Sequence, residues 1–401
     1  MALNVKIGLI GPFDMLKFKN MAKVREKAIQ KAEAKDISGD FAINTKAKQL
    51  HPDVMELVVD EIIDHGKAGA KSFVFKSENG HIAYFRAGQY LSIKEQIGDS
   101  FITRPYSISS SPKDALSGKI MITVKSNPAG FAAEHFLNDW QVGSRVLASD
   151  PQGQFYYEPL RDAKTVVACA GGSGITPFIS MAKAIRDGIE DFNLIILFGS
   201  RDRESVLFAE ELDDICSTTK KVKVVHVLSD EEFEGYEHGF ISAELIKKYA
   251  PASDYSVFIC GPEAMYRFIE KELPSLNLPD KNIRRELLGV TKNVYDQPGY
   301  PAECKDKTFK VTVKRGPSEE IIDASSGESV LVALERAGIK APSRCRSGEC
   351  GWCRTKLVSG SVFVPEENEG RRFTDIEFNY IHPCASFATS DLVIEVPGEY
   401  Y

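Results

Sequence analysis

Short runs of branched and aromatic apolar residues, separated by turn residues, mark the chain from about residue 55 to residue 150. Runs of this composition and length are typical of β-strands. Their regular spacing favours a small antiparallel barrel. The predicted strands are residues 72–76, 90–93, 119–124 and 145–148.

The pattern changes between roughly residues 163 and 290. The apolar runs there are nearly continuous, as in strands of a parallel sheet that is covered on both faces. Helical segments intervene between the runs, and this alternation predicts a doubly wound parallel sheet. The predicted strands are residues 165–170, 194–198, 222–228 and 256–260.

A connector follows from residue 279 to residue 304, and an apolar run at 309–314 opens a glycine-rich C-terminal part. A chain of 401 residues has room for two to four domains. The sequence therefore predicts a multidomain protein of mixed α+β and α/β class. The predicted parts are an N-terminal extension (1–50), a barrel (51–160), an α/β domain (161–290), a linker (291–306) and a C-terminal domain (307–401).

The N-terminal extension is basic, with ten Lys/Arg and five Asp/Glu in residues 1–50. The stretch from Met15 to Lys35 predicts one helix with a weak apolar stripe. Two interpretations are open for this helix. It is either a solvated helix packed loosely on the body or a docking helix for an acidic partner or an anionic surface.

Bulk properties exclude several classes of protein. The formal net charge of −7 gives no reason to expect nucleic acid as a partner. No apolar run is long enough to cross a membrane, and the N-terminus lacks the features of a secretory signal. Eight cysteines, four of them in one motif, fit a reducing compartment. We therefore expect a cytoplasmic protein.

Four cysteines near the C-terminus carry the clearest chemical signal. Cys345, Cys350 and Cys353 are spaced C-x4-C-x2-C, and Cys384 follows later in the chain. This is the plant-type ferredoxin spacing for the thiolate ligands of a 2Fe–2S cluster. Glycines in the loop let backbone amides turn toward sulfur without a Cβ in the way. The motif predicts an iron–sulfur centre with these four cysteines as its metal ligands.

Zinc and disulfides are the alternatives for these cysteines. Tetrahedral zinc usually takes two paired ligand sets, whereas Cys384 has no nearby cysteine and only His382 two residues before it. Structural disulfides are typical of small secreted domains, and this chain is not small. The cluster is the favoured interpretation.

The barrel contains a string that suits a flavin nucleotide, Arg104-Pro105-Tyr106-Ser107. A guanidinium pairs with phosphate, a phenol stacks on an isoalloxazine, and a hydroxyl reaches the flavin N5 region. Lys125 follows, and then a turn opens a predicted helix whose N-terminal amides suit a pyrophosphate. The turn residues are Gly130, Phe131 and Ala132. An ordinary strand and a surface turn remain the alternatives for the two segments.

The first strand of the α/β domain runs into a glycine-rich loop that opens a helix. Glycines permit close approach, and the helix N-terminus presents its dipole to a phosphate. The last strand ends in Cys260, Gly261 and Pro262 at an edge where ligands collect in such sheets. Cys260 is either a small buried hydrophobe or a neighbour of a nicotinamide, and we favour the second. The loop residues are Gly171, Gly172, Gly174, Ile175, Thr176 and Pro177.

Together and in this order, the motifs resemble the ferredoxin–NAD(P) reductase superfamily of flavoproteins with a C-terminal plant-type ferredoxin domain. Oxygenase reductases and hybrid-cluster-protein reductases have this architecture, and the resemblance covers roughly residues 51–401. It implies an antiparallel flavin-binding β-barrel, a doubly wound parallel nucleotide-binding domain and a β-grasp ferredoxin domain.

The resemblance also implies roles for single residues. Arg104, Tyr106 and Ser107 would bind flavin, the glycine-rich loop would face the dinucleotide pyrophosphate, and Cys260 would lie by the nicotinamide. The chain departs from the family in three places. Ala133 stands where the flavin turn often has Ser or Thr, which bears on FAD against FMN. The run from Glu286 lacks the aromatic residue that often follows, and residues 1–50 have no recognised counterpart.

Charged residues after one predicted strand bear on the choice between NADH and NADPH. The strand that ends at Leu228 is followed by a serine, Asp230 and two glutamates. Carboxylates repel a 2′-phosphate and accept a hydrogen bond from a free ribose hydroxyl, so we expect NADH rather than NADPH. Arg201 and Arg203 lie one strand earlier and keep NADPH open as the alternative.

The sequence therefore predicts an enzyme that passes electrons from NADH through FAD, with FMN as the alternative, and a 2Fe–2S cluster to a separate terminal metalloenzyme or oxygenase. Ser107 is expected at flavin N5 and Cys260 beside the nicotinamide, as the two catalytic candidates. Arg344, Arg346 and Arg354 surround the cysteine loop and are expected to raise the cluster's potential. The alternative functions are an electron-transfer subunit of a larger complex and a redox-sensing docking protein.

Overall fold

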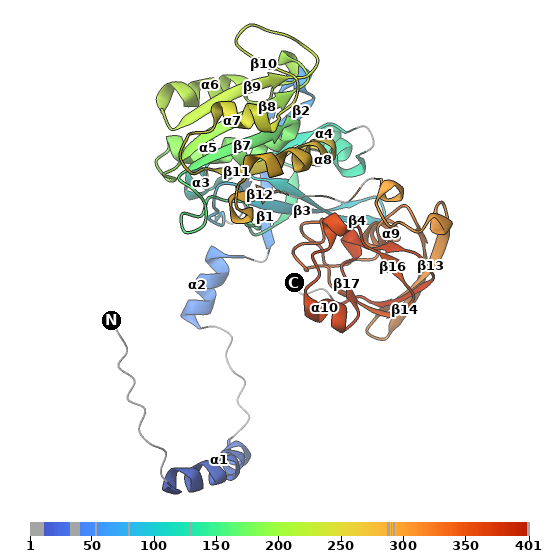
Figure 1. The fold of residues 1–401 in the computed structure, drawn as a ribbon. Coiled ribbons are helices and arrows are strands. Elements are labelled where there is room, and N and C mark those ends of the chain that lie inside the picture. The colour runs from blue at the N-terminus through green and yellow to red at the C-terminus, as the bar shows by residue number, and fades with distance from the viewer. Residues whose placement is uncertain are drawn as a thin grey trace. The chain divides into compact units, whose positions relative to one another are not determined.

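The computed structural model describes residues 12–32, 41–52, 54–78, 81–127, 130–286, 289, 291 and 293–398. The chain divides into two compact units, residues 1–47 and residues 48–401 (Figure 1). The N-terminal unit holds α1 (Pro12–Lys31) and the start of α2 (Ala42–Leu50). The predicted helix is confirmed, although it begins three residues before Met15, and Lys35 lies outside the described residues. Its apolar side chains Leu16, Val24 and Ile29 are exposed.

The second unit begins with a six-stranded antiparallel sheet in the order β4-β3-β6-β1-β2-β5. A bridge between Ile108 and Ile122 joins the two ends of this order and closes the predicted barrel. The sequence patterns missed β1, which pairs with both β2 and β6. The strands are β1 (Val54–Asp64), β2 (Ala70–Ser77), β3 (Tyr90–Ile97), β4 (Ser100–Ser107), β5 (Lys119–Lys125) and β6 (Arg145–Ser149).

Two short helices accompany the barrel, α3 (Pro112–Leu116) and α4 (Phe131–Asp139). Helix α4 packs on the barrel core through Phe136 and its C-cap residue Trp140, whose ring centroid lies 5.0 Å from that of Phe73. Both side chains belong to the same buried cluster as Phe73 of β2. Burying aromatic side chains of this size supplies a large share of the hydrophobic stabilisation of a small barrel.

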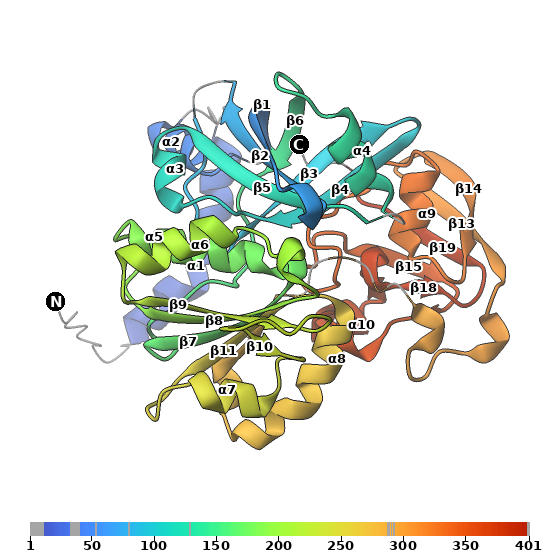
Figure 2. The same ribbon diagram turned by 90° about the horizontal axis from the view of Figure 1, so that it is seen from above.

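A parallel sheet follows in the order β10-β9-β8-β7-β11-β12. Buried side chains of α5 and α6 pack on one face of it, and those of α7 and α8 pack on the other (Figure 2). This confirms the predicted doubly wound sheet. The strands are β7 (Thr165–Gly171), β8 (Asn193–Ser200), β9 (Val222–Leu228), β10 (Glu237–His238), β11 (Ser256–Cys260) and β12 (Ile283–Arg285). The helices are α5 (Thr176–Arg186), α6 (Ala209–Thr218), α7 (Ala243–Tyr249) and α8 (Glu263–Glu272).

The C-terminal domain is built on a five-stranded mixed sheet in the order β14-β13-β19-β15-β17. Helix α9 packs on it with Val330, Ala333 and Leu334 in the core. The cysteine loop lies between α9 and β15. The elements are β13 (Thr308–Arg315), β14 (Ser318–Ser325), α9 (Val330–Arg336), β15 (Thr355–Ser359), β16 (Val362–Phe363), α10 (Phe373–Glu377), β17 (Tyr380–Ile381), β18 (Phe387–Ala388) and β19 (Leu392–Glu395).

The barrel and the parallel sheet are joined by buried polar contacts. In α5, the Ser180 hydroxyl donates to the Ser110 carbonyl at 2.7 Å, and the Lys183 ammonium donates to the Ser109 carbonyl at 3.0 Å. These contacts hold the segment that follows β4 against the middle and the last turn of α5. Within the part of the chain that the structure describes, no helix is both long and apolar enough to cross a membrane.

Candidate functional site

A cavity of about 710 Å³ lies where the barrel, the parallel sheet and the C-terminal domain meet. This volume is in the range of small-molecule and cofactor pockets. Ends of parallel strands meet at its wall, where ligands bind in open α/β sheets. Of the predicted residues, those that line it are Pro105, Tyr106, Ser107, Lys125, Gly171, Gly172, Gly174, Thr176, Cys260, Gly261 and Pro262.

The barrel contributes the C-terminal end of β4 to the cavity. Ser107 is 7% exposed there, and burial raises the pKa of the Tyr106 phenol well above its usual range. Tyr106 is therefore a neutral aromatic wall next to a buried hydroxyl, an arrangement that suits a flat heteroaromatic ring. Arg104 does not line the cavity, and its guanidinium contacts Glu335 instead.

Lys125 ends β5 close to the glycine-rich loop. A Cβ built on Gly172 would lie 3.8 Å from the Lys125 Nζ, and Gly172 has a φ of 54°. Burial lowers the pKa of Lys125, and nearby Arg201 lowers it further. An ammonium held in a partly buried site next to a second cation is suited to bind a phosphate, which would relieve both effects.

The turn that is predicted to bind the pyrophosphate lies outside the cavity lining, unlike most of the other predicted site residues. Gly130 caps α4, but Gly130, Phe131 and Ala132 are not among the lining residues of the cavity. The Glu134 carboxylate accepts hydrogen bonds from the Ser126 hydroxyl at 2.8 Å and from the Asn127 amide at 3.0 Å. This carboxylate therefore lies next to the helix start whose N-terminal amides are predicted to bind a pyrophosphate, and it binds two donors that precede the helix.

The glycine-rich loop packs backbone against backbone on the end of β11. A Cβ on Gly174 would lie 2.1 Å from the Cys260 carbonyl oxygen, and one on Gly171 would lie 2.5 Å from the Met265 sulfur. Only glycine allows this approach. The loop forms a 3₁₀ turn over Gly172–Ile175 before α5 begins. Ile175 and Pro177 are buried and anchor the loop rather than line the cavity.

Cys260 and Glu286 form the buried wall opposite the barrel. Burial raises the pKa of the Cys260 thiol well above its usual range, so the thiol is neutral. Burial also raises the pKa of the Glu286 carboxyl well above its usual range. Glu286 is 7% exposed, and its Oε2 atom has no hydrogen-bond partner within the described residues. A buried carboxyl oxygen without a partner beside a cavity fits a ligand that forms a hydrogen bond with it.

Sequence reasoning missed Glu286 as a site residue, although the signal was available. Glu286 directly follows β12, and β12 pairs with β11, whose last residue is Cys260. A carboxylate at the carboxyl end of a parallel strand meets the same criterion that selected Cys260.

Asp230 does not line the cavity. It follows β9, and its carboxylate accepts a hydrogen bond from the Ser229 hydroxyl at 2.5 Å. The Arg203 guanidinium is paired with Glu231 at 2.8 Å and lies over the Phe233 ring. The pairing neutralises one of the two arginines that could bind a 2′-phosphate.

The four motif cysteines come together around one loop. The sulfurs of Cys353 and Cys384 are 3.4 Å apart, and the Cys350 amide donates to the Cys345 sulfur at 3.4 Å. The thiols of Cys350 and Cys384 donate to the Cys345 sulfur, which lowers the pKa of Cys345 and raises those of its two donors. Four sulfurs at such separations fit the ligand set of a 2Fe–2S cluster.

The loop around these sulfurs is shaped by glycines. Gly348 and Gly351 have φ values of 89° and 69°, and a Cβ on Gly348 would lie 2.3 Å from the Asn368 carbonyl oxygen. The described residues hold no group of three or more His, Cys, Asp or Glu that could hold a single metal ion. A two-iron centre does not require such a group, because each iron takes two of the four thiolates.

Comparisons with known proteins match this arrangement part by part. Family models match the oxidoreductase FAD-binding domain at residues 56–157, the oxidoreductase NAD-binding domain at 169–271 and the 2Fe-2S iron-sulfur cluster binding domain at 313–389. The ferredoxin reductase component of 3-ketosteroid-9-alpha-monooxygenase from Mycolicibacterium smegmatis is 30% identical over 355 residues, which cover 85% of this chain and 96% of the relative. The chain belongs to this family of iron–sulfur flavoprotein reductases.

Further relatives support the assignment of the chain to this family. The glycine betaine monooxygenase reductase subunit from Chromohalobacter salexigens is 27% identical over 342 residues, which cover 81% of this chain and 91% of the relative. The solved structure of phthalate dioxygenase reductase, a modular structure for electron transfer from pyridine nucleotides to [2Fe-2S], matches with a TM-score of 0.60. Its sequence identity is 26%, and the match covers 86% of this chain and 98% of that one.

The family membership confirms the expected fold class and the kind of enzyme. The reductase is an oxidoreductase with an FAD-binding, an NAD-binding and a 2Fe-2S domain in that order along the chain. The cavity and the cysteine loop fit these groups through the neutral aromatic wall of Tyr106, the unpartnered Glu286 oxygen and the converging sulfurs.

In the reductase, the cysteine loop reaches the cavity directly. Ser347, which lies between Cys345 and Cys350, lines the cavity, and so does Asn368, whose amide donates to the Ser347 carbonyl at 3.2 Å. The Gly289 amide donates to the Cys345 carbonyl at 3.2 Å. The same cavity wall therefore carries groups from the cysteine loop and from the two upstream domains.

Glu335 of α9 joins the cysteine loop to the barrel. Its carboxylate lies 2.5 Å from the Arg346 guanidinium and 3.1 Å from the Arg104 guanidinium, and it accepts the Thr103 amide at 3.3 Å. The side chains of Glu335 and Arg346 are 7% and 3% exposed. This buried Arg–Glu–Arg triad was not predicted from the sequence, and it gives Arg104 and Arg346 a partner inside the protein.

Proposed function

We propose that this reductase takes electrons from NADH, passes them through a bound flavin and a 2Fe–2S cluster, and delivers them one at a time to a separate terminal metalloenzyme or oxygenase. The observation that carries the proposal is the cavity whose wall includes the end of β4, the glycine-rich loop, Cys260 and Ser347 of the cysteine loop. Three redox groups held around one cavity would need no large movement to exchange electrons.

When bound, a flavin supplies the exchange between two-electron hydride chemistry and the one-electron steps of an iron–sulfur cluster. The residues of the chain would orient the flavin and the nicotinamide and shield them from water. Ser107 offers a buried hydroxyl to the N5 side of the ring, and Cys260 offers a neutral thiol to the nicotinamide. A thiol whose pKa is raised by burial is a poor nucleophile, so Cys260 positions the nicotinamide and forms no covalent bond with it.

NADH is the proposed nucleotide, since Asp230 follows β9 and Glu231 neutralises Arg203. FAD is the proposed flavin, in line with the FAD-binding family model. Lys125 and the loop from Gly171 to Thr176 are the proposed phosphate contacts. We propose the domain boundaries predicted from the sequence. We also propose a cytoplasmic location, because a chain with eight cysteines, four of them the proposed cluster ligands and none joined in a disulfide, fits a reducing compartment.

The test is anaerobic reduction of the reconstituted protein. NADH is expected to bleach first the flavin and then the cluster absorption, with NADPH slower, and ferricyanide is expected to sustain NADH oxidation. A Cys384→Ser variant keeps flavin bleaching and loses the cluster signal. A colourless protein that binds zinc and no flavin would contradict the proposal.

Two alternative functions give different results in the same experiment. A redox-sensing docking protein binds flavin and cluster but shows no steady turnover with ferricyanide. A fixed subunit of a larger complex turns over but elutes with its partner in stoichiometric amounts when purified from its source. A freely exchanging reductase turns over and elutes alone.

A further inference from the structure

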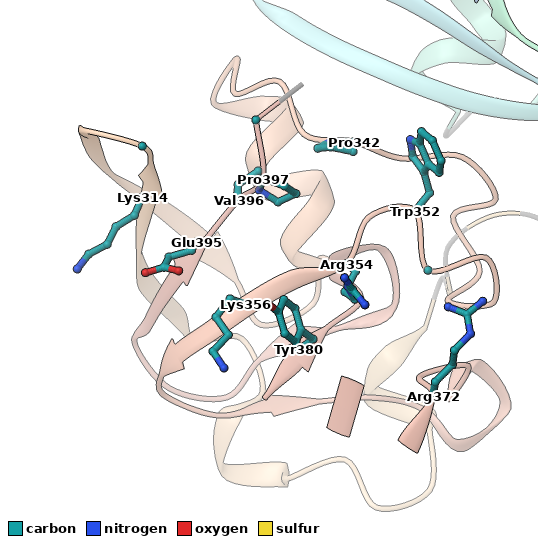
Figure 3. Close-up of a pocket in the computed structure, with 13 residues that line it drawn as sticks. Lys314, Pro342, Trp352, Arg354, Lys356, Arg372, Tyr380, Glu395, Val396 and Pro397 are labelled. Carbon is teal, nitrogen blue, oxygen red and sulfur yellow. The ribbon is translucent and has the colours of Figure 1, made fainter. Parts of the chain in front are cut away.

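A second cavity, a groove of about 840 Å³, lies on the C-terminal domain beside the cysteine loop (Figure 3). Gly351 and Trp352, which stand between Cys350 and Cys353, form part of its wall. The rest comes from Pro342, from residues in or next to β13, β15, β17 and β19, and from Arg372 at the start of α10. None of the cofactor contacts or metal ligands predicted from the sequence lines this groove.

The groove is basic. Lys314, Arg354, Lys356 and Arg372 line it, against Glu395 as the one acidic lining residue among those described. Within the described residues, Lys356 and Arg372 belong to no ion pair with a carboxylate. Arg354 is paired with the buried Asp375 at 3.3 Å, and Lys314 is 3.9 Å from Glu319. This positive patch stands on a chain whose formal net charge is −7.

Aromatic side chains form part of the lining of the groove, and two more are exposed at the ends of α10, the helix that follows the lining residue Arg372. Trp352 is 42% exposed, and Phe373 and Phe378, at the two ends of α10, are 79% and 60% exposed. Tyr380 lies under Arg354, with the guanidinium 4.8 Å from the ring centroid. Tryptophan, tyrosine, phenylalanine and arginine are the side chains enriched at protein–protein interfaces, where they carry most of the binding energy.

The groove reaches the metal ligands through one residue. The Trp352 amide donates to the Cys350 sulfur at 3.4 Å, and Cys350 is the least buried of the four cysteines. The Arg344 guanidinium lies over the Trp352 ring, 3.7 Å from the ring centroid, and Arg344 is paired with Asp150 of the barrel at 3.4 Å. A partner seated in the groove would therefore contact the backbone that binds the cluster.

We propose that this groove is the docking surface for the protein that receives the electrons, and that the partner presents a carboxylate-rich surface around its own redox centre. The proposal rests on the proposed reductase function and adds the charge of the partner. Complementary charge raises the rate of encounter and orients the two centres, whereas the aromatic lining residues Trp352 and Tyr380 supply the short-range contact.

The test compares two protein probes of opposite charge, the acidic haem protein cytochrome b5 and the basic haem protein cytochrome c. The groove variant is the double change Lys314→Glu and Lys356→Glu, which leaves the cysteine loop and the Arg354–Asp375 pair intact. The matched control is Lys220→Glu and Lys247→Glu, two exposed positions of the nucleotide-binding domain with the same change in net charge.

At low ionic strength, we expect the groove variant to lower kcat/KM for cytochrome b5 by about tenfold or more and to flatten its salt dependence. The control pair is expected to stay within about twofold of the unchanged protein. Anaerobic reduction of the flavin by NADH without an added acceptor and the cluster absorption spectrum serve as checks on folding, and both are expected to stay unchanged.

Equal losses in the groove and control variants would overturn the proposal, as would a preference for cytochrome c, or a groove variant that changes only self-association in sedimentation. Failure of the reductase function is recognised in a separate experiment that contains NADH and no acceptor. If the function fails, the cluster stays oxidised in that experiment. In that case, equilibrium titration of the oxidised protein with cytochrome b5 decides on the groove, since binding needs no electron transfer.

Discussion

The change Glu335→Gln tests whether the buried Arg–Glu–Arg triad holds the cysteine loop to the barrel. The amide side chain would keep the shape of the carboxylate and remove its charge, leaving the guanidiniums of Arg104 and Arg346 facing one another in a buried site. The repulsion is already visible in the native protein, where burial and Arg346 lower the pKa of Arg104.

The magnitude follows from the burial of the triad. Breaking a buried ion pair by removing one partner costs about 3–5 kcal/mol, because an uncompensated charge stays buried. At about 1.4 kcal/mol for each tenfold change, the separated arrangement of the two domains gains a factor of roughly 100 to 4,000 in population. With about 2.1 cal/mol/K of unfolding entropy per residue over residues 48–401, the expected fall in Tm is roughly 4–7 °C.

The assay is anaerobic stopped-flow reduction by NADH, with flavin and cluster followed at separate wavelengths. We expect flavin bleaching at the native rate, because the nucleotide-binding wall is untouched, and cluster reduction slowed at least about tenfold. The control is Asp323→Asn, which removes the exposed Lys310–Asp323 pair in the same domain. Exposed pairs contribute about 0–1 kcal/mol, so this variant should change neither rate.

The reasoning would be refuted if Glu335→Gln left both Tm and the rate of cluster reduction unchanged. A fall in Tm with a native rate of cluster reduction would have a different meaning. It would show that the triad stabilises the fold without setting the distance between the flavin and the cluster.

Three further predictions concern the other parts of the reductase. Gly174→Ala places a Cβ 2.1 Å from the Cys260 carbonyl oxygen, so NADH affinity measured by titration should fall at least about tenfold while the flavin content is retained. Cys384→Ser should abolish the cluster absorption, and the buried Cys304, which lies outside the motif, should tolerate the same change with the cluster intact. Two lysines lower the pKa of Asp191 to about 2, so its contribution to stability is present above about pH 4 and is lost as the pH falls through 2. Urea unfolding should therefore show that Asp191→Asn destabilises the protein at pH 6 and has little effect near pH 2.

The fold and the cysteine motif were predictable because their signals are local. A continuous apolar run such as 165–170 indicates a buried strand by itself, and C-x4-C-x2-C brings three ligands together within one loop. The end of β4, the glycine-rich loop and Cys260 were assigned for the same reason, since each is a short string with its own chemistry. The structure then placed these segments at one cavity.

The contacts that join the domains could not be predicted in the same way. Glu335 stands on α9 in an ordinary helical sequence, and nothing near it indicates that Arg104, from a distant part of the chain, will share its carboxylate. The sequence did mark the arginines around the cysteine loop, but it assigned them to the potential of the cluster. Their carboxylate partners, Glu335, Asp150 and Asp375, become visible only when the chain is folded.

Because these arginines are paired with carboxylates, we expect them to affect the reduction potential of the cluster less than the sequence predicts. An unpaired cation near a 2Fe–2S centre favours the reduced form, whereas a cation already neutralised by a carboxylate contributes much less. Arg346 and Arg354 each have a buried carboxylate partner, and Arg344 is paired with Asp150. Among the described residues, Arg372 of the basic groove is a cation that belongs to no ion pair, and a Cβ on Gly351 would lie 3.1 Å from its guanidinium. An acidic partner that neutralises this groove would therefore remove a stabilising influence on the reduced cluster at the moment of docking, and so favour release of the electron to that partner.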